Sequence, residues 1–263
     1  MLILFFLYII KIMLKKPNNK IENNRIAKII SRSGAYSRRD AEKLILSGKV
    51  KLNGKIVITP ATLANSKDII LIDEKKIPSE LKTKIWILNK PKGYITTSKD
   101  PQNRKTVFNL LPKKINHLIS IGRLDINTEG LLLFTNNGEL SRFMEHPSNR
   151  LIRRYKIKAR GKLDQKLIDK MHGEIIIENT KYNVISVNLV SYSDVNTWLL
   201  IEISEGKNRE IRKICDYFNL QISRLIRTKF GPFELGNIEK GSFIEIDYKL
   251  VNLRLKKIGF NNR

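Results

Sequence analysis

The sequence predicts an α+β protein in two parts: a small helix–helix–hairpin unit, then a larger domain built on a mixed, largely antiparallel sheet. Two observations support this prediction. Residues 25–58 show helical apolar spacing twice and then strand-like alternation. Beyond residue 84, short apolar runs rich in β-branched residues follow one another without regular crossover helices, which disfavours a parallel α/β sheet. With 41% apolar residues among 263, the chain can bury a core.

The small unit begins with two expected helices. Apolar residues from Ile26 to Ile30 recur at helical spacing, and Gly34 is expected to end that helix. Ser37 and Asp40 then form an S-x-x-D capping pattern, in which the hydroxyl and the carboxylate satisfy free amides at the start of a second helix.

A hairpin is expected from Val50 to Ile58. The pair Asn53-Gly54 between alternating apolar residues favours a tight turn, because both turn positions need positive φ. Basic side chains lie between the apolar positions of the second helix and the hairpin. We expect them to line one side of the unit and to contact RNA or DNA; the alternative is an ordinary solvated surface. These residues are Arg38, Arg39, Lys43, Lys49, Lys51 and Lys55.

The net charge points to a polyanionic partner. Lys and Arg number 50 against 25 Asp and Glu, which gives a formal charge of +25. Folding alone does not require this excess, because like charges repel in a compact state. Nucleic acid is favoured over an anionic membrane surface as the partner, and no stable membrane association is expected.

The cysteine and histidine content restricts the chemistry. The single cysteine, Cys215, excludes an internal disulfide and a cysteine-cluster metal site, and it suits a reducing, cytoplasmic compartment. The three histidines lie far apart and show no helical ligand spacing, so no metal site is predicted.

The first residues, MLILFFLYIIKIML, are strongly apolar but too short for a membrane span of about 20 residues, and Lys11 interrupts them. They also lack the features of a signal peptide. Residues 1–24 are therefore treated as an extension outside the fold. They form either a short anchoring or packing helix or, as we favour, the product of a start site upstream of Met13.

The larger domain follows a basic linker near residues 78–84. Helical patterns interrupt the strand-like runs at Leu163–His172 and Glu210–Phe218. The expected strands are the runs IWILNKP, GYITTS, GLLLFT, YKIKARG, EIIIEN, NVISVNLV, TWLLIEIS and FIEID.

One loop in this domain is a candidate for chemistry. Asp125 lies two residues after Arg123, and the loop leads directly into the apolar run 131–134. A rigid strand end is a good place to fix a catalytic group, and an Asp in so basic a chain would repel phosphate without a function of its own. The alternative is a turn-forming Asp that accepts hydrogen bonds from nearby amides.

Two resemblances extend this interpretation. The segment RIAKIISRSGAYSRRDAEKLILSGKVKLNGKIV resembles the S-four module that binds structured RNA. The segment IGRLDINTEGLLLFTNNGEL is similar to the defining motif of pseudouridine synthases of the RsuA/RluB type. LNKPKGY, RRYKIKARG, EGKNREIRKICDYF and SRLIRTKFGPFELGNIEKGSF agree with that family in the same order, so the resemblance covers residues 25–250.

The resemblance implies roles for individual residues. Asp125 matches the catalytic aspartate, a nucleophile toward the sugar C1′ or the pyrimidine C6. Tyr155 matches a tyrosine whose ring stacks on uracil and whose hydroxyl handles a proton. Arg212 matches a basic partner of the aspartate, with Arg209 as the competing candidate, and the true partner is expected within hydrogen-bonding distance of Asp125.

Two further residues are implied to bind the substrate. Arg123 matches an arginine that fills the gap left when the uridine leaves the stack; the alternative is a plain phosphate contact. Leu225 matches an apolar residue of the uracil pocket, with core packing as the alternative. Lys207 departs from the family, which often has arginine there.

The resemblance implies a ribosomal RNA pseudouridine synthase that needs no cofactor and acts on large-subunit RNA in the cytoplasm as a monomer. Its expected parts are residues 1–24, an S-four-like domain at 25–80 and a catalytic domain of the pseudouridine synthase type at 85–255. The alternatives are a non-catalytic rRNA-binding assembly factor on the same fold and a general basic RNA-binding protein.

Overall fold

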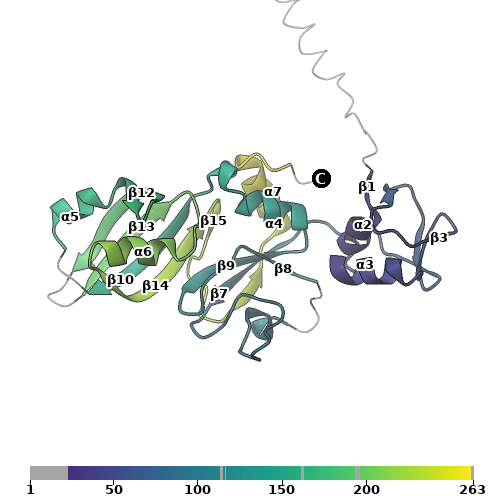
Figure 1. Ribbon diagram of the computed structural model, residues 1–263, viewed down its shortest axis with the longest axis horizontal. Coiled ribbons are helices and arrows are strands. Elements are labelled where there is room, and N and C mark those ends of the chain that lie inside the picture. Colours follow the sequence, from purple (N-terminus) through teal and green to yellow (C-terminus); the bar gives the residue numbers. More distant parts are fainter. Residues whose placement is uncertain (1–22, 113–114, 116, 161–162, 193–195, 262–263) are drawn as a thin grey trace, which may run out of the picture. The chain divides into compact units, whose positions relative to one another are not determined.

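The computed structural model describes residues 23–112, 115, 117–160, 163–192 and 196–261 (Figure 1). Most of the expected extension at 1–24 therefore lies outside the described residues. The chain divides into two compact units between Leu81 and Lys82. No described helix is long and apolar enough to cross a membrane.

The smaller unit packs two short helices on a small antiparallel sheet with the order β3-β2-β5-β6. The side chain of Ser37 accepts a hydrogen bond from the Asp40 amide at 3.2 Å, which confirms the hydroxyl part of the predicted cap. The Asp40 carboxylate accepts a hydrogen bond from the Ser37 hydroxyl at 2.6 Å. Asn53 and Gly54 have φ of 50° and 83°, as the predicted tight turn requires. The elements are β1 (Asn24–Arg25), α2 (Ile26–Arg32), α3 (Arg38–Leu46), β2 (Val50–Leu52), β3 (Lys55–Val57), β4 (Leu63–Ala64), β5 (Ile70–Ile72) and β6 (Lys75–Lys76).

The larger unit is built on one ten-stranded sheet, whose main path runs β11-β12-β13-β10-β14-β9-β7-β16. β8 pairs with β9, and β15 pairs with β14. The strands are β7 (Ile85–Lys90), β8 (Ile119–Ile121), β9 (Glu129–Thr135), β10 (Arg153–Arg160), β11 (Gly173–Ile177), β12 (Thr180–Tyr192), β13 (Thr197–Ile203), β14 (Gln221–Phe230), β15 (Phe233–Glu234) and β16 (Phe243–Glu245).

Helices cover this sheet on both faces (Figure 1). α6 packs over one cluster of buried side chains, while α4 and α7 pack over a second cluster. β7 and β9 contribute alternate residues to the two clusters, which explains why both strands are apolar almost throughout. The helices are η1 (Val107–Leu110), α4 (Gly138–Glu145), η2 (Pro147–Asn149), α5 (Gln165–Lys170), α6 (Glu210–Tyr217) and α7 (Tyr248–Lys257).

A parallel pairing joins the two halves of the sheet. β14 and β9 run parallel, with Ile226 opposite Glu129 and Arg227 opposite Gly130. Gly130 has φ of 97°, and a Cβ placed on it would lie 2.4 Å from the Arg227 carbonyl oxygen. Only glycine therefore allows β9 to begin so close to β14. The loop that carries Asp125 enters the sheet at this junction.

The structure corrects one expected strand. The run GYITTS forms only an isolated bridge between Ile95 and Thr106. Thr96 instead binds the Asp125 loop: its hydroxyl donates to the Leu124 carbonyl at 2.8 Å and accepts from the Leu124 amide at 3.2 Å. The predicted helix at Leu163–His172 is shorter, at Gln165–Lys170, and β14 was not among the expected strands.

Candidate active site

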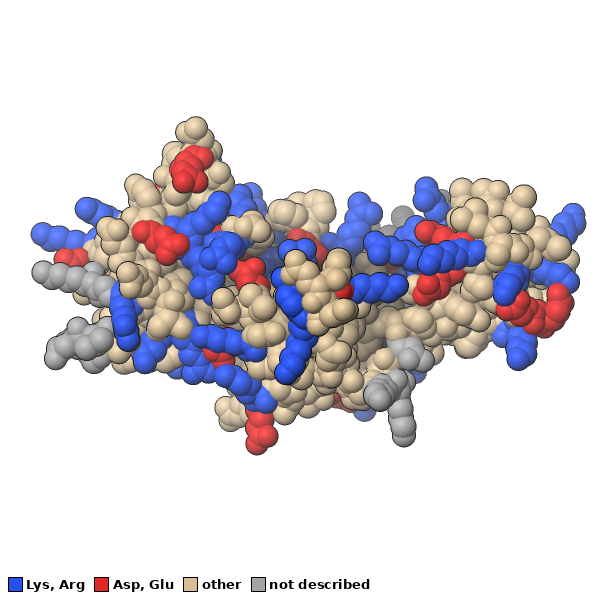
Figure 2. All heavy atoms as spheres, turned by 60° about the horizontal axis from the view of Figure 1, so that its bottom comes forward, with Lys and Arg blue, Asp and Glu red and all other residues tan. Residues whose placement is uncertain are grey.

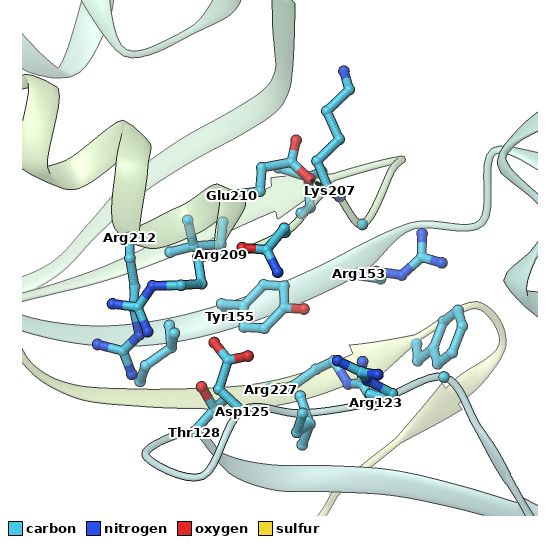
Figure 3. Close-up of a pocket in the computed structure, with 18 of the residues that line it drawn as sticks. Arg123, Asp125, Thr128, Arg153, Tyr155, Lys207, Arg209, Glu210, Arg212 and Arg227 are labelled. Atoms are coloured by element: carbon cyan, nitrogen blue, oxygen red, sulfur yellow. Dashed lines mark hydrogen bonds between the residues drawn. The ribbon is translucent and has the colours of Figure 1, made fainter. Parts of the chain in front are cut away.

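All six residues predicted for catalysis and substrate binding line one cavity of about 380 Å³ in the larger unit (Figure 3). The cavity lies among the loop before β9, the strands β10 and β14, and the start of α6. Its volume falls within the range of about 300–1,000 Å³ that is usual for small-molecule sites. The six residues are Arg123, Asp125, Tyr155, Arg209, Arg212 and Leu225.

Asp125 is half-buried on a loop that a buried lysine fixes in place. The ammonium of Lys90 is enclosed and donates to the carbonyl oxygens of Asp125 at 3.0 Å and Thr128 at 2.8 Å. Burial lowers the pKa of Lys90 to about 8, although the charges of Asp125 and Glu129 act in the opposite direction. Sequence reasoning did not single out Lys90, whose only signal was its place in LNKPKGY.

Glu129, the residue that follows the Asp125 loop, is held by ion pairs. Glu129 is buried and accepts two hydrogen bonds from Arg224, at 3.0 and 3.1 Å, and pairs with Lys240 at 2.6 Å. Burial alone would raise the pKa of Glu129, but these cations hold it below the ordinary value. Lys90 and this ion pair together fix the Asp125 loop where it enters β9.

The ion pair expected between Asp125 and an arginine is not formed. Arg212 instead donates from Nη2 to the Asn127 carbonyl at 3.2 Å, and Arg209 is exposed. Burial and the neighbouring charge of Arg209 lower the pKa of Arg212, while the charges of Asp125 and Asp216 raise it. Arg212 thus contacts the Asp125 loop through the Asn127 backbone and not through the carboxylate, and its buried Nε has no hydrogen-bond partner among the described residues.

Tyr155 and Leu225 form the apolar wall of the cavity. They lie on the neighbouring strands β10 and β14, where Tyr155 pairs with Arg227 and Leu225 pairs with Ile157. Tyr155 is 9% exposed and Leu225 is 4% exposed, so both belong to the core as well as to the cavity. The Asp125 carboxylate points toward the Tyr155 ring (Figure 3).

Three more buried charged residues line the cavity and were missed from the sequence: Arg153, Arg227 and Glu210. Burial, with the nearby charge of Glu205, raises the pKa of Glu210 to about 8, which favours its neutral form at pH 7. The burial of Arg153 and Arg227 depends on the nonlocal pairing of β10 with β14, which a sequence pattern does not show. Glu210 begins α6, and its burial depends on how that helix packs on the sheet.

Two alternatives to an aspartate nucleophile are a cysteine nucleophile and a metal site. Burial raises the pKa of the Cys215 thiol to about 12, which keeps it protonated. The described residues contain no group of three or more His, Cys, Asp or Glu side chains placed to hold a metal ion. Arg123 is exposed at the rim of the cavity, where it can meet a polyanion.

The basic residues of the smaller unit do not all share one side. Lys51 pairs with Ile56 across the hairpin, whereas Lys55 pairs with Leu52, so the two lysines lie on opposite faces. Lys51 also pairs with Glu74 at 2.6 Å. Arg38 is exposed and pairs with Glu42 at 3.4 Å. The other four predicted contacts, all exposed, are Arg39, Lys43, Lys49 and Lys55.

These features define a class of protein: an enzyme with a strongly basic accessory unit and a cavity lined by a carboxylate, a tyrosine and several guanidinium groups. Two family models identify both parts. The RNA pseudouridylate synthase model matches residues 84–217, and the S4 domain model matches residues 24–70. The chain belongs to the RNA pseudouridine synthase family, in its RsuA/RluB type, and is an RNA-binding enzyme of that family.

Relatives cover most of the chain. A protein of Rickettsia bellii named an uncharacterized RNA pseudouridine synthase is 46% identical over 226 residues, which are 86% of this chain and 98% of the relative. The ribosomal large subunit pseudouridine synthase B of Buchnera aphidicola is 38% identical over 238 residues, 88% of this chain and 95% of the relative. The fold matches a crystal structure of a pseudouridylate synthase with a TM-score of 0.58 and 23% identity, covering 87% and 98% of the two chains.

Proposed function

We propose that the protein converts one uridine of large-subunit ribosomal RNA to pseudouridine, with Asp125 as the nucleophile. The observation that carries the proposal is the Asp125 carboxylate, which faces the Tyr155 ring from a loop fixed by Lys90 and Glu129. Relatives from Buchnera aphidicola and Haemophilus influenzae, 38% and 33% identical, carry the name ribosomal large subunit pseudouridine synthase B, which supports the choice of RNA.

The proposed reaction rearranges one glycosidic link. The Asp125 carboxylate attacks either C1′ of the ribose or C6 of the uracil. The N1–C1′ bond breaks, the uracil turns within the cavity, and a C5–C1′ bond forms. The proton on C5 is then lost and N1 gains one, so the product is an isomer of the substrate and Asp125 is released unchanged.

The other residues hold the base and the Asp125 loop. Tyr155 stacks on the uracil and its hydroxyl passes the C5 proton, while Leu225 packs against the base from β14. Arg123, at the rim, fills the space that the extruded uridine leaves in the RNA. Arg212 is a positioning residue that holds the Asp125 loop through its hydrogen bond to the Asn127 carbonyl.

Pseudouridine mapping tests this function. Ribosomal RNA from cells lacking the gene is compared with RNA from cells that carry the wild-type chain, Asp125→Asn or Asp169→Asn. We expect one large-subunit uridine to be modified only with the wild-type chain and Asp169→Asn, because Asp169 is exposed on α5 outside the cavity. Asparagine keeps the size of Asp125 but removes its nucleophilicity, so turnover should fall below detection.

A different outcome would contradict each part of the proposal: the nucleophile, the RNA substrate and the activity itself. Modification by Asp125→Asn at the wild-type rate would exclude Asp125 as nucleophile. A changed uridine in small-subunit RNA would correct only the substrate. An unchanged pseudouridine map would favour the non-catalytic assembly factor.

A further inference from the structure

Two buried arginines share one end of the cavity and have no part in the chemistry above. The Cζ atoms of Arg153 and Arg227 lie 4.5 and 5.0 Å from the ring centroid of Phe230. Arg153 is 7% exposed and Arg227 is 2% exposed. In Figure 3 both lie to the right of the Tyr155 ring, whereas Arg212 lies to its left.

The hydrogen bonds of these arginines are incomplete. Arg153 donates from Nη1 to the Leu151 and Ser204 carbonyls, at 3.1 and 3.4 Å. Arg227 donates from Nε to the Leu131 carbonyl at 2.9 Å, but its buried Nη2 has no hydrogen-bond partner. Buried polar groups are nearly always paired, so an unpaired guanidinium nitrogen at a cavity wall indicates a missing acceptor.

The positive charge at this end is only partly balanced. Within the described residues, neither arginine forms an ion pair. Burial and the charge of Arg227 lower the pKa of Arg153, whereas nearby acidic groups, Glu210 and Glu145 among them, raise it. Two carboxyl groups line the same cavity. Glu145 accepts a hydrogen bond from Ser141 at 2.5 Å, and burial raises the pKa of Glu210 to about 8, which favours its neutral form at pH 7. An anion would therefore offset the repulsion between two neighbouring guanidinium groups.

We propose that Arg153 and Arg227 bind a phosphodiester group of the RNA, next to the uridine whose base faces Asp125. This subsite rests on the proposed function, because it places a nucleotide in the cavity. A phosphate supplies both the negative charge and several acceptor oxygens. Arginine suits a phosphate because its planar guanidinium offers several donors at once, and the contact with Phe230 holds the Arg153 guanidinium in place. A uracil carbonyl would satisfy Nη2 but would balance neither charge.

Nucleotide binding to the full chain tests the subsite without turnover. Uridine, uridine 3′-monophosphate and uridine 5′-monophosphate are titrated by calorimetry at one ionic strength. We expect at least one monophosphate to bind about tenfold or more tightly than uridine. In Arg227→Gln and Arg153→Gln this ratio should fall toward one, while uridine itself binds as in the wild type.

Arg154→Gln is the matched control. Arg154 lies on the same strand as Arg153 but on the other face, where it pairs with Glu202 at 2.7 Å, and it does not line the cavity. Its loss removes the same charge and should leave the ratio unchanged. An equal fall in Arg154→Gln, or a ratio of one in the wild type, would overturn the subsite.

A second measurement needs no variant, in case a buried substitution prevents folding. Inorganic phosphate should weaken binding of the preferred monophosphate to the wild type but leave uridine binding unchanged, compared with chloride at equal ionic strength. Equal effects on both probes would contradict the proposal. An unchanged pseudouridine map combined with a clear monophosphate preference would instead reject the proposed function and keep the subsite.

Discussion

Two ionisable groups at the Asp125 loop and its cavity, Lys90 and Glu210, have pKa values that burial shifts. Lys90 is enclosed beneath the loop, and its pKa is lowered to about 8, so it is still largely protonated at pH 7. Glu210, on the opposite side of the cavity, has a pKa raised to about 8, which favours its neutral form at the same pH. The cavity therefore combines a cationic loop support with a carboxyl that does not repel RNA.

The pH dependence of stability should report on Glu210. Its pKa rises from 4.5 to about 8 on folding, so the folded state binds more protons between these values and the free energy of unfolding falls as pH rises through them. Glu210→Gln stays neutral and should avoid this loss. At about pH 8 we expect the variant to be more stable than the wild type by on the order of a few kcal/mol.

Urea unfolding at several pH values between about 5 and 8 measures this difference. Glu178→Gln is the control, because Glu178 is exposed in the turn between β11 and β12. Its stability should follow the wild-type curve. If the free energy of unfolding of Glu210→Gln and of the wild type changed with pH in parallel, Glu210 would be ionised in both the folded and the unfolded state.

Substitution of the two arginines near Asp125 should change different kinetic parameters. Arg212 is half-buried and bonded to the Asn127 carbonyl, so Arg212→Ala should lower kcat by about 100-fold or more, as for loss of an electrostatic stabiliser. Arg209 is exposed, and Arg209→Ala should mainly raise KM for RNA. Turnover at saturating RNA separates the two effects, and a reversed result would exchange the two roles.

At the scale of the elements, the sequence predicted what local chemistry determines. The Ser37 cap, the Asn53-Gly54 turn and β10, whose buried residues alternate, follow from neighbouring residues and were found. The parallel pairing of β9 with β14 brings together residues almost 100 positions apart, and no local pattern encodes it. The Asp125 loop was predictable from its motif, but the burial of Lys90 was not, because lysine is normally a surface residue.

The junction between β9 and β14 depends on Gly130. Gly130→Ala would place a Cβ 2.4 Å from the Arg227 carbonyl oxygen and 2.8 Å from Ile226 Cγ2, at a φ of 97°. Backbone strain and overpacking together should lower the free energy of unfolding by about 2–5 kcal/mol. Activity should fall as well, because the Asp125 loop enters the sheet here.

Gly173→Ala isolates the backbone contribution. Gly173 has a φ of 88°, but a Cβ on it would meet nothing within 4 Å. Urea unfolding should therefore show a smaller loss for Gly173→Ala than for Gly130→Ala. Equal losses would mean that the close approach of the two strands carries no cost of its own.

At the scale of the whole molecule, positive charge extends over both units. Lys and Arg side chains outnumber Asp and Glu on the face shown in Figure 2. Residues 1–84 hold 18 Lys and Arg against 7 Asp and Glu, and residues 85–263 hold 32 against 18. The first 84 residues are thus the more densely basic part, although the lysines of the smaller unit do not all lie on one face.

The division of labour between the units predicts how RNA binding depends on salt. If the S4 domain contacts phosphates, replacing four of its exposed basic residues by Gln should weaken binding and reduce the slope of log K against log salt by about 0.7–0.9 for each lost contact. Turnover at saturating RNA should persist, because the cavity lies within the larger unit. The four residues are Arg39, Lys43, Lys49 and Lys55.

A second quadruple variant separates local contact from net charge. Lys166 and Lys170 on α5 and Lys256 and Lys257 on α7 are also exposed, and their replacement by Gln removes the same total charge. Because counterions are released only where a cation meets a phosphate, this variant should keep a slope close to that of the wild type. If both variants lost the same slope, the RNA would respond to the charge of the whole molecule, and the S4 domain would supply no contact of its own.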